Sequence, residues 1–148
     1  MWEVNMDNAA SRRMFLMAAA CLLATPLSAQ ETPDMTGAQS AIKGQLEAFL
    51  ADDAKGAYAY AAPNIKRLFP TVERFMSMVE QGYQPVRRPS SYSFGQSIPM
   101  AGDTVLQEVL LVDGDGKGWK AIYRMQRQPD GTWKIAGVSL KAADLPTA

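Results

Sequence analysis

Carboxylates are the side chains in this sequence that come nearest to a catalytic arrangement. Asp52 and Asp53 are adjacent, and one carboxylate can raise the pKa of another, as acid–base chemistry requires. They stand between two helical patterns, however, where an aspartate oxygen caps free backbone N–H groups, and capping is the favoured interpretation. Glu108 lies within an apolar run and is the candidate catalytic residue. A solvent-facing strand position is the favoured alternative for it.

Aromatic side chains offer more for ligand binding than the carboxylates do for catalysis. Tyr92 and Tyr123 lie in alternating segments and their hydroxyl groups need partners, so both are predicted to line a pocket. Tyr58 and Trp119 are further candidates, with core packing as the alternative. Arg88 belongs to a small basic cluster that could pair with an anionic group, unless it only begins a solvated strand. The predicted ligand-binding residues are therefore Tyr58, Tyr92, Trp119, Tyr123 and Arg88.

The composition argues against several other functions. The chain has 15 basic and 15 acidic residues, no histidine and one cysteine. Zero net charge argues against nucleic acid as a partner. The lack of histidine removes the commonest general base and metal ligand, and with them serine-hydrolase chemistry. A lone cysteine excludes an internal disulfide and a multi-cysteine metal site. We therefore expect no metal and no cofactor, and a non-enzymatic role more than an enzymatic one.

One glycine-rich segment resembles the start of a calcium-binding loop. Asp113 and Asp115 occupy loop positions one and three, and Gly118 occupies position six. Position five is Lys117 and position twelve is Arg124, whereas calcium needs oxygen ligands at both. Glycine and aspartate are also the residues of tight turns, so the segment is predicted to be a hairpin loop.

Residues 1–29 are predicted to be a signal peptide that sends the protein to the bacterial periplasm. Two arginines precede an apolar run (14–24) that is too short to span a bilayer, and a small-residue cleavage site ends at Ala29. The stretch 11–17 resembles the twin-arginine export motif, with Met17 in place of its usual lysine; an ordinary secretory signal is the alternative. No later segment is apolar enough to cross a membrane after cleavage.

The rest of the chain is predicted to be one domain over residues 36–141, with a flexible lead (30–35) and a tail (142–148). Its first half is helical. An apolar stripe from Ile42 to Leu50 indicates an amphipathic helix. Shorter helices are expected after Asp53, over 64–69 and after Thr71, the last ending at a left-handed Gly82.

The second half alternates with the period of β-strands. Strict alternation places Tyr92, Phe94, Gln96 and Ile98 on one face of the first strand. The four predicted strands cover 91–98, 105–112, 119–126 and 133–140. Helices followed by antiparallel strands indicate an α+β fold. A twisted sheet of this kind can curl around the helices and enclose an apolar hollow, which is the expected place for function.

Several segments resemble one known family: 45–54, 61–65, 75–83, 118–125 and 128–135. It is a family of short exported bacterial proteins classed as a domain of unknown function. That family is similar to the nuclear transport factor 2-like (SnoaL-like) superfamily, which includes ketosteroid isomerase and polyketide cyclases. The resemblance implies a cone-shaped, cystatin-like fold, with N-terminal helices packed on a curved four-stranded antiparallel sheet and a pocket at its wide end. Because members range from enzymes to binding modules, the fold alone selects no function.

Three functions are consistent with these features. The leading hypothesis is non-catalytic binding of a small apolar molecule or a peptide on the concave face of the sheet. The second is a lyase or isomerase of ketosteroid-isomerase type, with Glu108 as base and Tyr92 or Tyr123 holding the enolate. The third is a homodimer formed through an apolar outer sheet face. Its predicted residues are Ile122, Val138 and Leu140.

Overall fold

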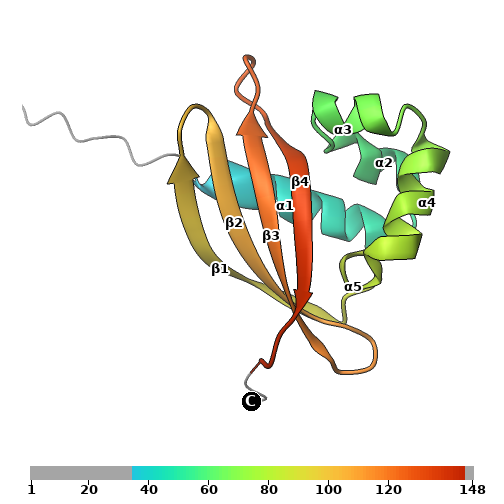
Figure 1. Cartoon of the computed structure of the whole chain (residues 1–148). Coiled ribbons are helices and arrows are strands. Elements are labelled where there is room, and N and C mark those ends of the chain that lie inside the picture. The colour runs from blue at the N-terminus through green and yellow to red at the C-terminus, as the bar shows by residue number, and fades with distance from the viewer. Residues whose placement is uncertain (1–34, 146–148) are drawn as a thin grey trace, which may run out of the picture. The chain divides into compact units, whose positions relative to one another are not determined.

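The computed structural model describes residues 35–145, and the predicted signal peptide and most of the lead lie outside them. Five helices precede four strands (Figure 1), so the predicted α+β order is confirmed. The helices are α1 (Met35–Leu50), α2 (Ala54–Ala59), α3 (Pro63–Leu68), α4 (Val72–Gly82) and α5 (Gln84–Arg87). The strands are β1 (Ser91–Met100), β2 (Thr104–Val112), β3 (Gly118–Arg127) and β4 (Trp133–Ala142).

Side-chain caps mark where two of the short helices, α2 and α4, begin. The Asp53 carboxylate accepts a hydrogen bond from the Gly56 backbone N–H at 2.9 Å, so its predicted capping role is confirmed. Asp52 adopts the left-handed conformation, with φ 57°, as α1 ends. Gly82 does not: it is the last residue of α4, and Tyr83 directly after it caps both the end of α4 and the start of α5. The prediction of a left-handed Gly82 is wrong because the chain enters the next helix directly.

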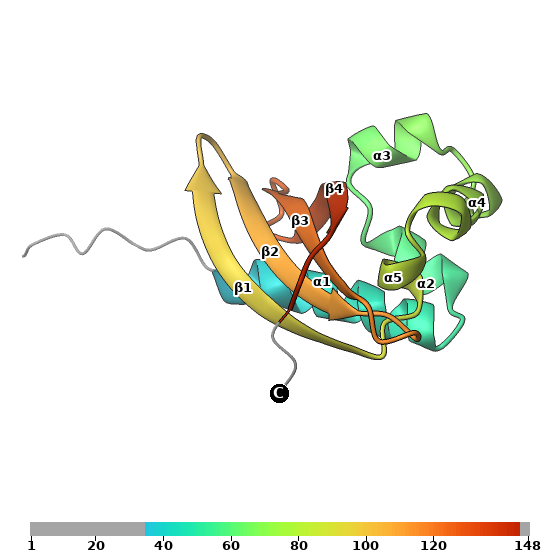
Figure 2. The same cartoon turned by 60° about the horizontal axis from the view of Figure 1, so that its bottom comes forward.

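The four strands form one antiparallel sheet in the order β1-β2-β3-β4. This sheet curves around α1, and α2 to α5 lie beyond its β4 edge (Figure 2). Part of that edge is covered, since the Ile135 backbone donates to Tyr60 O and accepts from Ala62 N, both at 2.8 Å. No helix within residues 35–145 has the length and apolarity needed to cross a membrane.

The helix-facing side of the sheet forms the core together with α1. Ala38, Ile42 and Leu46 of α1 have no exposed surface. They belong to one apolar cluster with the buried strand residues, and a helix of this length can supply a continuous stripe. The strand members are Val105, Val109, Leu111, Ala121, Tyr123, Met125, Trp133 and Ile135.

A β-bulge in β1 breaks the predicted alternation. The pairing with β2 shifts between Phe94 and Ser97. Ser97 pairs with the buried Gln107 and so faces the helices, whereas Ile98 pairs with Leu106 on the other side. The expectation that Gln96 and Ile98 share a face with Tyr92 and Phe94 is therefore wrong, because the extra residue of a bulge reverses the alternation beyond it.

A second bulge lies in β4. Arg124 pairs with Gly137 and Met125 pairs with Ile135, so Ala136 is the extra residue. Beyond it Val138 lies opposite Tyr123, which places Val138 on the helix-facing side, and Leu140 follows there opposite Ala121. The predicted outer trio of Ile122, Val138 and Leu140 is therefore wrong, because only Ile122 faces outward. Dimer formation itself stays a prediction.

Candidate functional site

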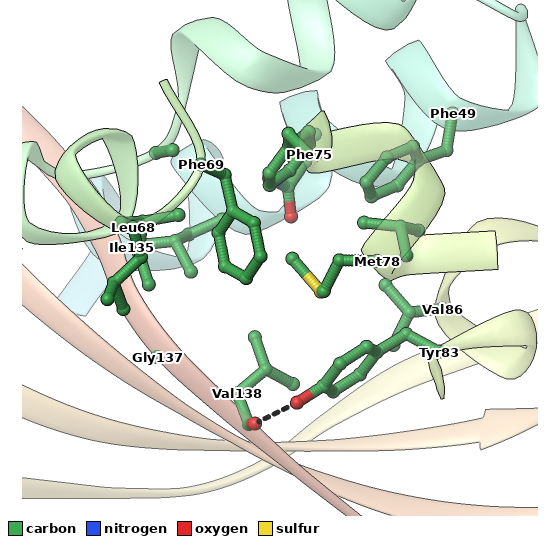
Figure 3. A pocket seen from close by; sticks show the side chains of 14 residues that line it. Phe49, Leu68, Phe69, Phe75, Met78, Tyr83, Val86, Ile135, Gly137 and Val138 are labelled. Carbon is green, nitrogen blue, oxygen red and sulfur yellow. Dashed lines mark hydrogen bonds between the residues drawn. The ribbon is translucent and has the colours of Figure 1, made fainter. Parts of the chain in front are cut away.

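A cavity of about 270 Å³ lies between β4 and the short helices. Figure 3 shows its walls, which are made mainly of aromatic and aliphatic side chains. Its lining residues come from α1, α3, α4, α5, β4 and the adjoining connections: Gln45, Phe49, Ala61, Ile65, Leu68, Phe69, Phe75, Met78, Val79, Tyr83, Val86, Ile135, Gly137 and Val138.

Helical spacing directs the side chains of α3 toward this cavity. Ile65 and Leu68 of α3, with Phe69 directly after it, follow the i, i+3, i+4 pattern of one helix face. Leu68 is nevertheless 69% exposed. A lining residue with so much exposed surface lies at the mouth of the cavity, where it is open to solvent.

Few polar groups line the cavity, and those present already have partners. The Tyr83 hydroxyl donates to Val138 O at 3.2 Å (Figure 3), and the Gln45 amide nitrogen donates to Ala57 O at 3.1 Å. No acidic or basic side chain is found among the described residues that line it. The cavity therefore suits binding of hydrocarbon better than proton transfer.

Two of the predicted ligand-binding residues take part in local packing. The Tyr58 hydroxyl donates to Phe69 O at 2.6 Å, and its ring packs against Phe75 with centroids 5.2 Å apart. Tyr92 lies on β1, across the sheet from the cavity, and makes an edge contact with Phe94 at 6.1 Å. Both side chains belong to the packing around the core.

The other three are also placed away from the cavity walls. Trp119 donates through Nε1 to an Asp113 carboxylate oxygen at 2.9 Å. Arg88 donates to Phe49 O at 2.7 Å and pairs with Asp52, which ties the end of α5 to the end of α1. Tyr123 is fully buried, and its hydroxyl has no hydrogen-bond partner among the described residues. That burial raises the pKa of Tyr123.

None of the five predicted ligand-binding residues is among those that line the cavity. The physical reason is the position of α1, which packs against β2 and β4 and whose buried side chains belong to one cluster with those of β2 and β3 on the concave face of the sheet. The hollow expected there lies instead beyond β3, between β4 and the short helices. Only β4 among the strands contributes to it.

Glu108 lies on the outer side of the sheet. It pairs with Ile122 in the strand register, and its carboxylate contacts Lys120 Nζ at 3.3 Å. It also packs over Gly95 in the β1 bulge, where any Cβ would overlap the carboxylate. Tyr92 and Tyr123 lie on the helix-facing side. The structure therefore does not bring the proposed base together with either tyrosine.

The calcium-like segment is a hydrogen-bonded hairpin loop. Asp113 Oδ1 accepts from the backbone N–H groups of Asp115 and Lys117, both at 2.9 Å. Together with the bond from Trp119, these contacts lower the pKa of Asp113. Within residues 35–145 no group of three or more potential metal ligands occurs. The carboxylate therefore holds the turn, as the hairpin interpretation predicts.

The cavity residues could be recovered only in part from the sequence. The apolar stripe of Ile65, Leu68 and Phe69 can be recognised in the sequence. A helix this short is stabilised by packing of its apolar face against other elements, so the stripe indicates contact with the rest of the domain. Gly137 and Val138 carry no such signal. Their position depends on the β4 bulge, which alternation does not reveal.

The described domain is an α+β domain with an open antiparallel sheet and an apolar cavity at one edge. The chain belongs to the family described as "Domain of unknown function (DUF4864)", whose model matches residues 31–148. No curated protein and no solved structure matches the chain.

Proposed function

We propose that this protein binds a small, largely apolar molecule, without catalysis, in the cavity between β4 and the short helices. The observation that carries the proposal is the cavity of about 270 Å³, walled by hydrocarbon and without a charged side chain among its described lining residues. When an apolar ligand displaces water from apolar surface of this kind, the free energy of the system falls, and this favours binding.

The walls favour a flat or flexible hydrocarbon. Phe69 and Phe75 present aromatic rings, and Met78 has an unbranched side chain that adapts to different shapes (Figure 3). Tyr83 is the one hydroxyl-bearing residue of this set, and it could exchange its bond to Val138 O for one to a ligand. A bound molecule with one polar atom would therefore be accommodated.

A small molecule fits this site better than an extended peptide. A peptide gains affinity at a sheet edge by adding a strand through main-chain hydrogen bonds. At the β4 edge the backbone of Ile135, which lines the cavity, already bonds to Tyr60 and Ala62. That part of the edge is therefore not free to pair with a peptide.

We also propose that the domain is related to the nuclear transport factor 2-like superfamily and acts in the periplasm. The order of helices before a curved antiparallel sheet supports the first part. The arginines and apolar run within residues 1–29 support the second. N-terminal sequencing of the protein recovered from the periplasm would test export, with a new N-terminus at Gln30 as the expected result.

Binding can be tested with the neutral fluorescent probe N-phenyl-1-naphthylamine. We expect saturable fluorescence enhancement with the wild-type domain. Leu68→Asp should weaken it strongly, because it places a charge at the cavity mouth. Leu50→Asp is the matched control: both leucines are the last residue of a helix and exposed, but Leu50 does not line the cavity. Equal binding by both variants, or no saturation, would contradict the proposal.

A further inference from the structure

A second hollow, of about 360 Å³, lies between α3 and the outer side of the sheet. It shares no lining residue with the apolar cavity, and most of its lining side chains are polar or charged. We call it the polar groove. Its side chains that can form hydrogen bonds are Asn64, Arg67, Thr104, Arg124, Gln126 and Gln128.

The β4 bulge builds this groove. The carbonyl of Ala136, its extra residue, accepts from Asn64 Nδ2 at 2.9 Å and from Arg124 Nη2 at 3.2 Å. One backbone oxygen thus positions side chains from α3 and β3. A Cβ at Gly137 would lie 3.8 Å from Arg124 Nε, so the guanidinium rests against this glycine. Bulges commonly re-aim side chains in this way next to functional sites.

The charge in the groove is unbalanced. Neither Arg67 nor Arg124 forms an ion pair with an acidic side chain within residues 35–145, and no acidic residue lines the groove. Arg87, Arg88 and Arg127, by contrast, are all paired with carboxylates. The predicted anion-binding cluster around Arg88 is therefore already neutralised by the protein, whereas the groove is not.

We propose that the polar groove binds a small molecule through an oxyanion, either a carboxylate or a phosphate. A guanidinium has five N–H donors in a planar fork that matches two oxygens of such a group. Arg124 uses one nitrogen on Ala136 O, which fixes its plane, and Arg67 is free to close over the anion. The amides of Gln126 and Gln128 and the Thr104 hydroxyl supply hydrogen bonds for the remainder of the ligand.

The test follows the arginine Nε–Hε signals of the domain by NMR during titration with sodium succinate and, separately, with inorganic phosphate. Sodium chloride at equal ionic strength is the reference. We expect saturable shifts at Arg67 and Arg124 with at least one of the two anions. Arg67→Gln and Arg124→Gln should each weaken the affinity by about tenfold, the loss expected for a charged hydrogen bond.

Arg74→Gln is the matched control, because Arg74 is exposed, lies outside the groove and forms no ion pair with the residues that the structure describes. It should leave the affinity unchanged. Arg67→Gln keeps the test valid if Arg124→Gln disturbs the bulge, since Arg67 is exposed and forms no ion pair with any residue from 35 to 145. Saturation with succinate alone identifies a carboxylate site, and with phosphate alone a phosphate site. Linear shifts with both anions, or equal losses in the Arg74 and Arg67 variants, would overturn the proposal.

Discussion

The helix-facing side of the sheet has two halves that are packed differently. In the packed half, the buried side chains of α1 meet those of β2 and β3, and Ile42, Leu46, Val109 and Tyr123 have no exposed surface. The same helix continues onto β4. In the hollow half, α3, α4 and α5 lie beside β4 and leave a cavity of about 270 Å³. Both halves are rich in apolar residues, so composition does not explain the difference.

Helix length does explain it. The single helix of the packed half has 16 residues and supplies six buried side chains in one continuous row. In the hollow half, α3 has 6 residues, α4 has 11 and α5 has 4, and together these three helices bury only Phe75, Val79, Pro85 and Val86. Each change of direction between short helices interrupts the row of side chains, so they cannot interdigitate with β4 along its length. The hollow is therefore a consequence of the breaks at Pro63, Pro70 and Pro85.

The largest effect is expected from a cavity made in the packed half. Leu46→Ala should lower the free energy of unfolding by about 3 kcal/mol, because it removes buried methyl groups where rigid neighbours cannot collapse. Urea unfolding followed by circular dichroism measures this value. A loss below about 1 kcal/mol, which is less than the transfer term for the atoms removed, would show that this half is not tightly packed.

A matched pair of valines compares the two halves directly. Val109 of β2 is fully buried in the packed half, and Val138 of β4 lines the cavity and is only partly buried. Val109→Ala should lower the free energy of unfolding by about 2 kcal/mol, and Val138→Ala by about 1 kcal/mol or less. Equal losses would mean that the hollow closes in solution. N-phenyl-1-naphthylamine should stabilise the wild type, and should do so less in the Val138 variant.

The packed half also contains an unfavourable group, the Tyr123 hydroxyl, which has no hydrogen-bond partner within the described part of the chain. Tyr123→Phe should therefore raise the free energy of unfolding by about 1 kcal/mol, since the desolvation cost of the hydroxyl disappears. Tyr92→Phe is the control, because Tyr92 is only partly buried. A destabilised Tyr123→Phe variant would show that the hydroxyl has a bound water or another partner in solution.

The same tyrosine gives a pH dependence with a defined sign. Burial raises the pKa of Tyr123 in the folded state above its ordinary value of 10.0. As the pH rises, the Tyr123 hydroxyl therefore loses its proton in the unfolded chain before it does so in the folded protein. Unfolding of the protein becomes more favourable above about pH 10 as a result. Stability that is fully present below that pH is lost above it. The stability advantage of Tyr123→Phe over the wild type should accordingly grow between about pH 10 and 11, which urea unfolding at several pH values in this range would measure.

Local sequence patterns predicted the positions of the helices and strands well. They did not predict the two bulges, and so they assigned some strand residues to the wrong face of the sheet. All four strands lie within two residues of their expected bounds, because alternation and turn residues such as Asp130-Gly131 are local signals. A bulge depends on pairing with the neighbouring strand. Alternation therefore gave the correct face for Tyr92, which precedes the β1 bulge, and for Tyr123 on β3, and the wrong face for Ile98 and Val138, which lie beyond the bulges of β1 and β4.

The site was harder to predict than the fold for a related reason. The sequence indicated that an apolar hollow should exist, but its place depended on how far α1 extends across the sheet. Tyr58, Trp119 and Tyr123 belong to the core cluster or pack against it, whereas the aromatic residues that line the cavity are Phe49, Phe69, Phe75 and Tyr83. The polar groove could not be found at all from sequence, since Asn64 and Arg124 meet only through the carbonyl of the bulge residue Ala136.

The smallest effect is expected outside both halves, in the loop between β2 and β3. Hydrogen bonds from Trp119 and from the backbone lower the pKa of Asp113 below its ordinary value of 3.8. The stability it contributes is present above that pH and is lost as the pH falls, because the unfolded chain takes up the proton first. Asp113→Asn should therefore flatten the acid side of the unfolding profile slightly. Acid unfolding followed by circular dichroism measures this profile, and a profile identical to that of the wild type would show that the Asp113 bonds do not persist in solution.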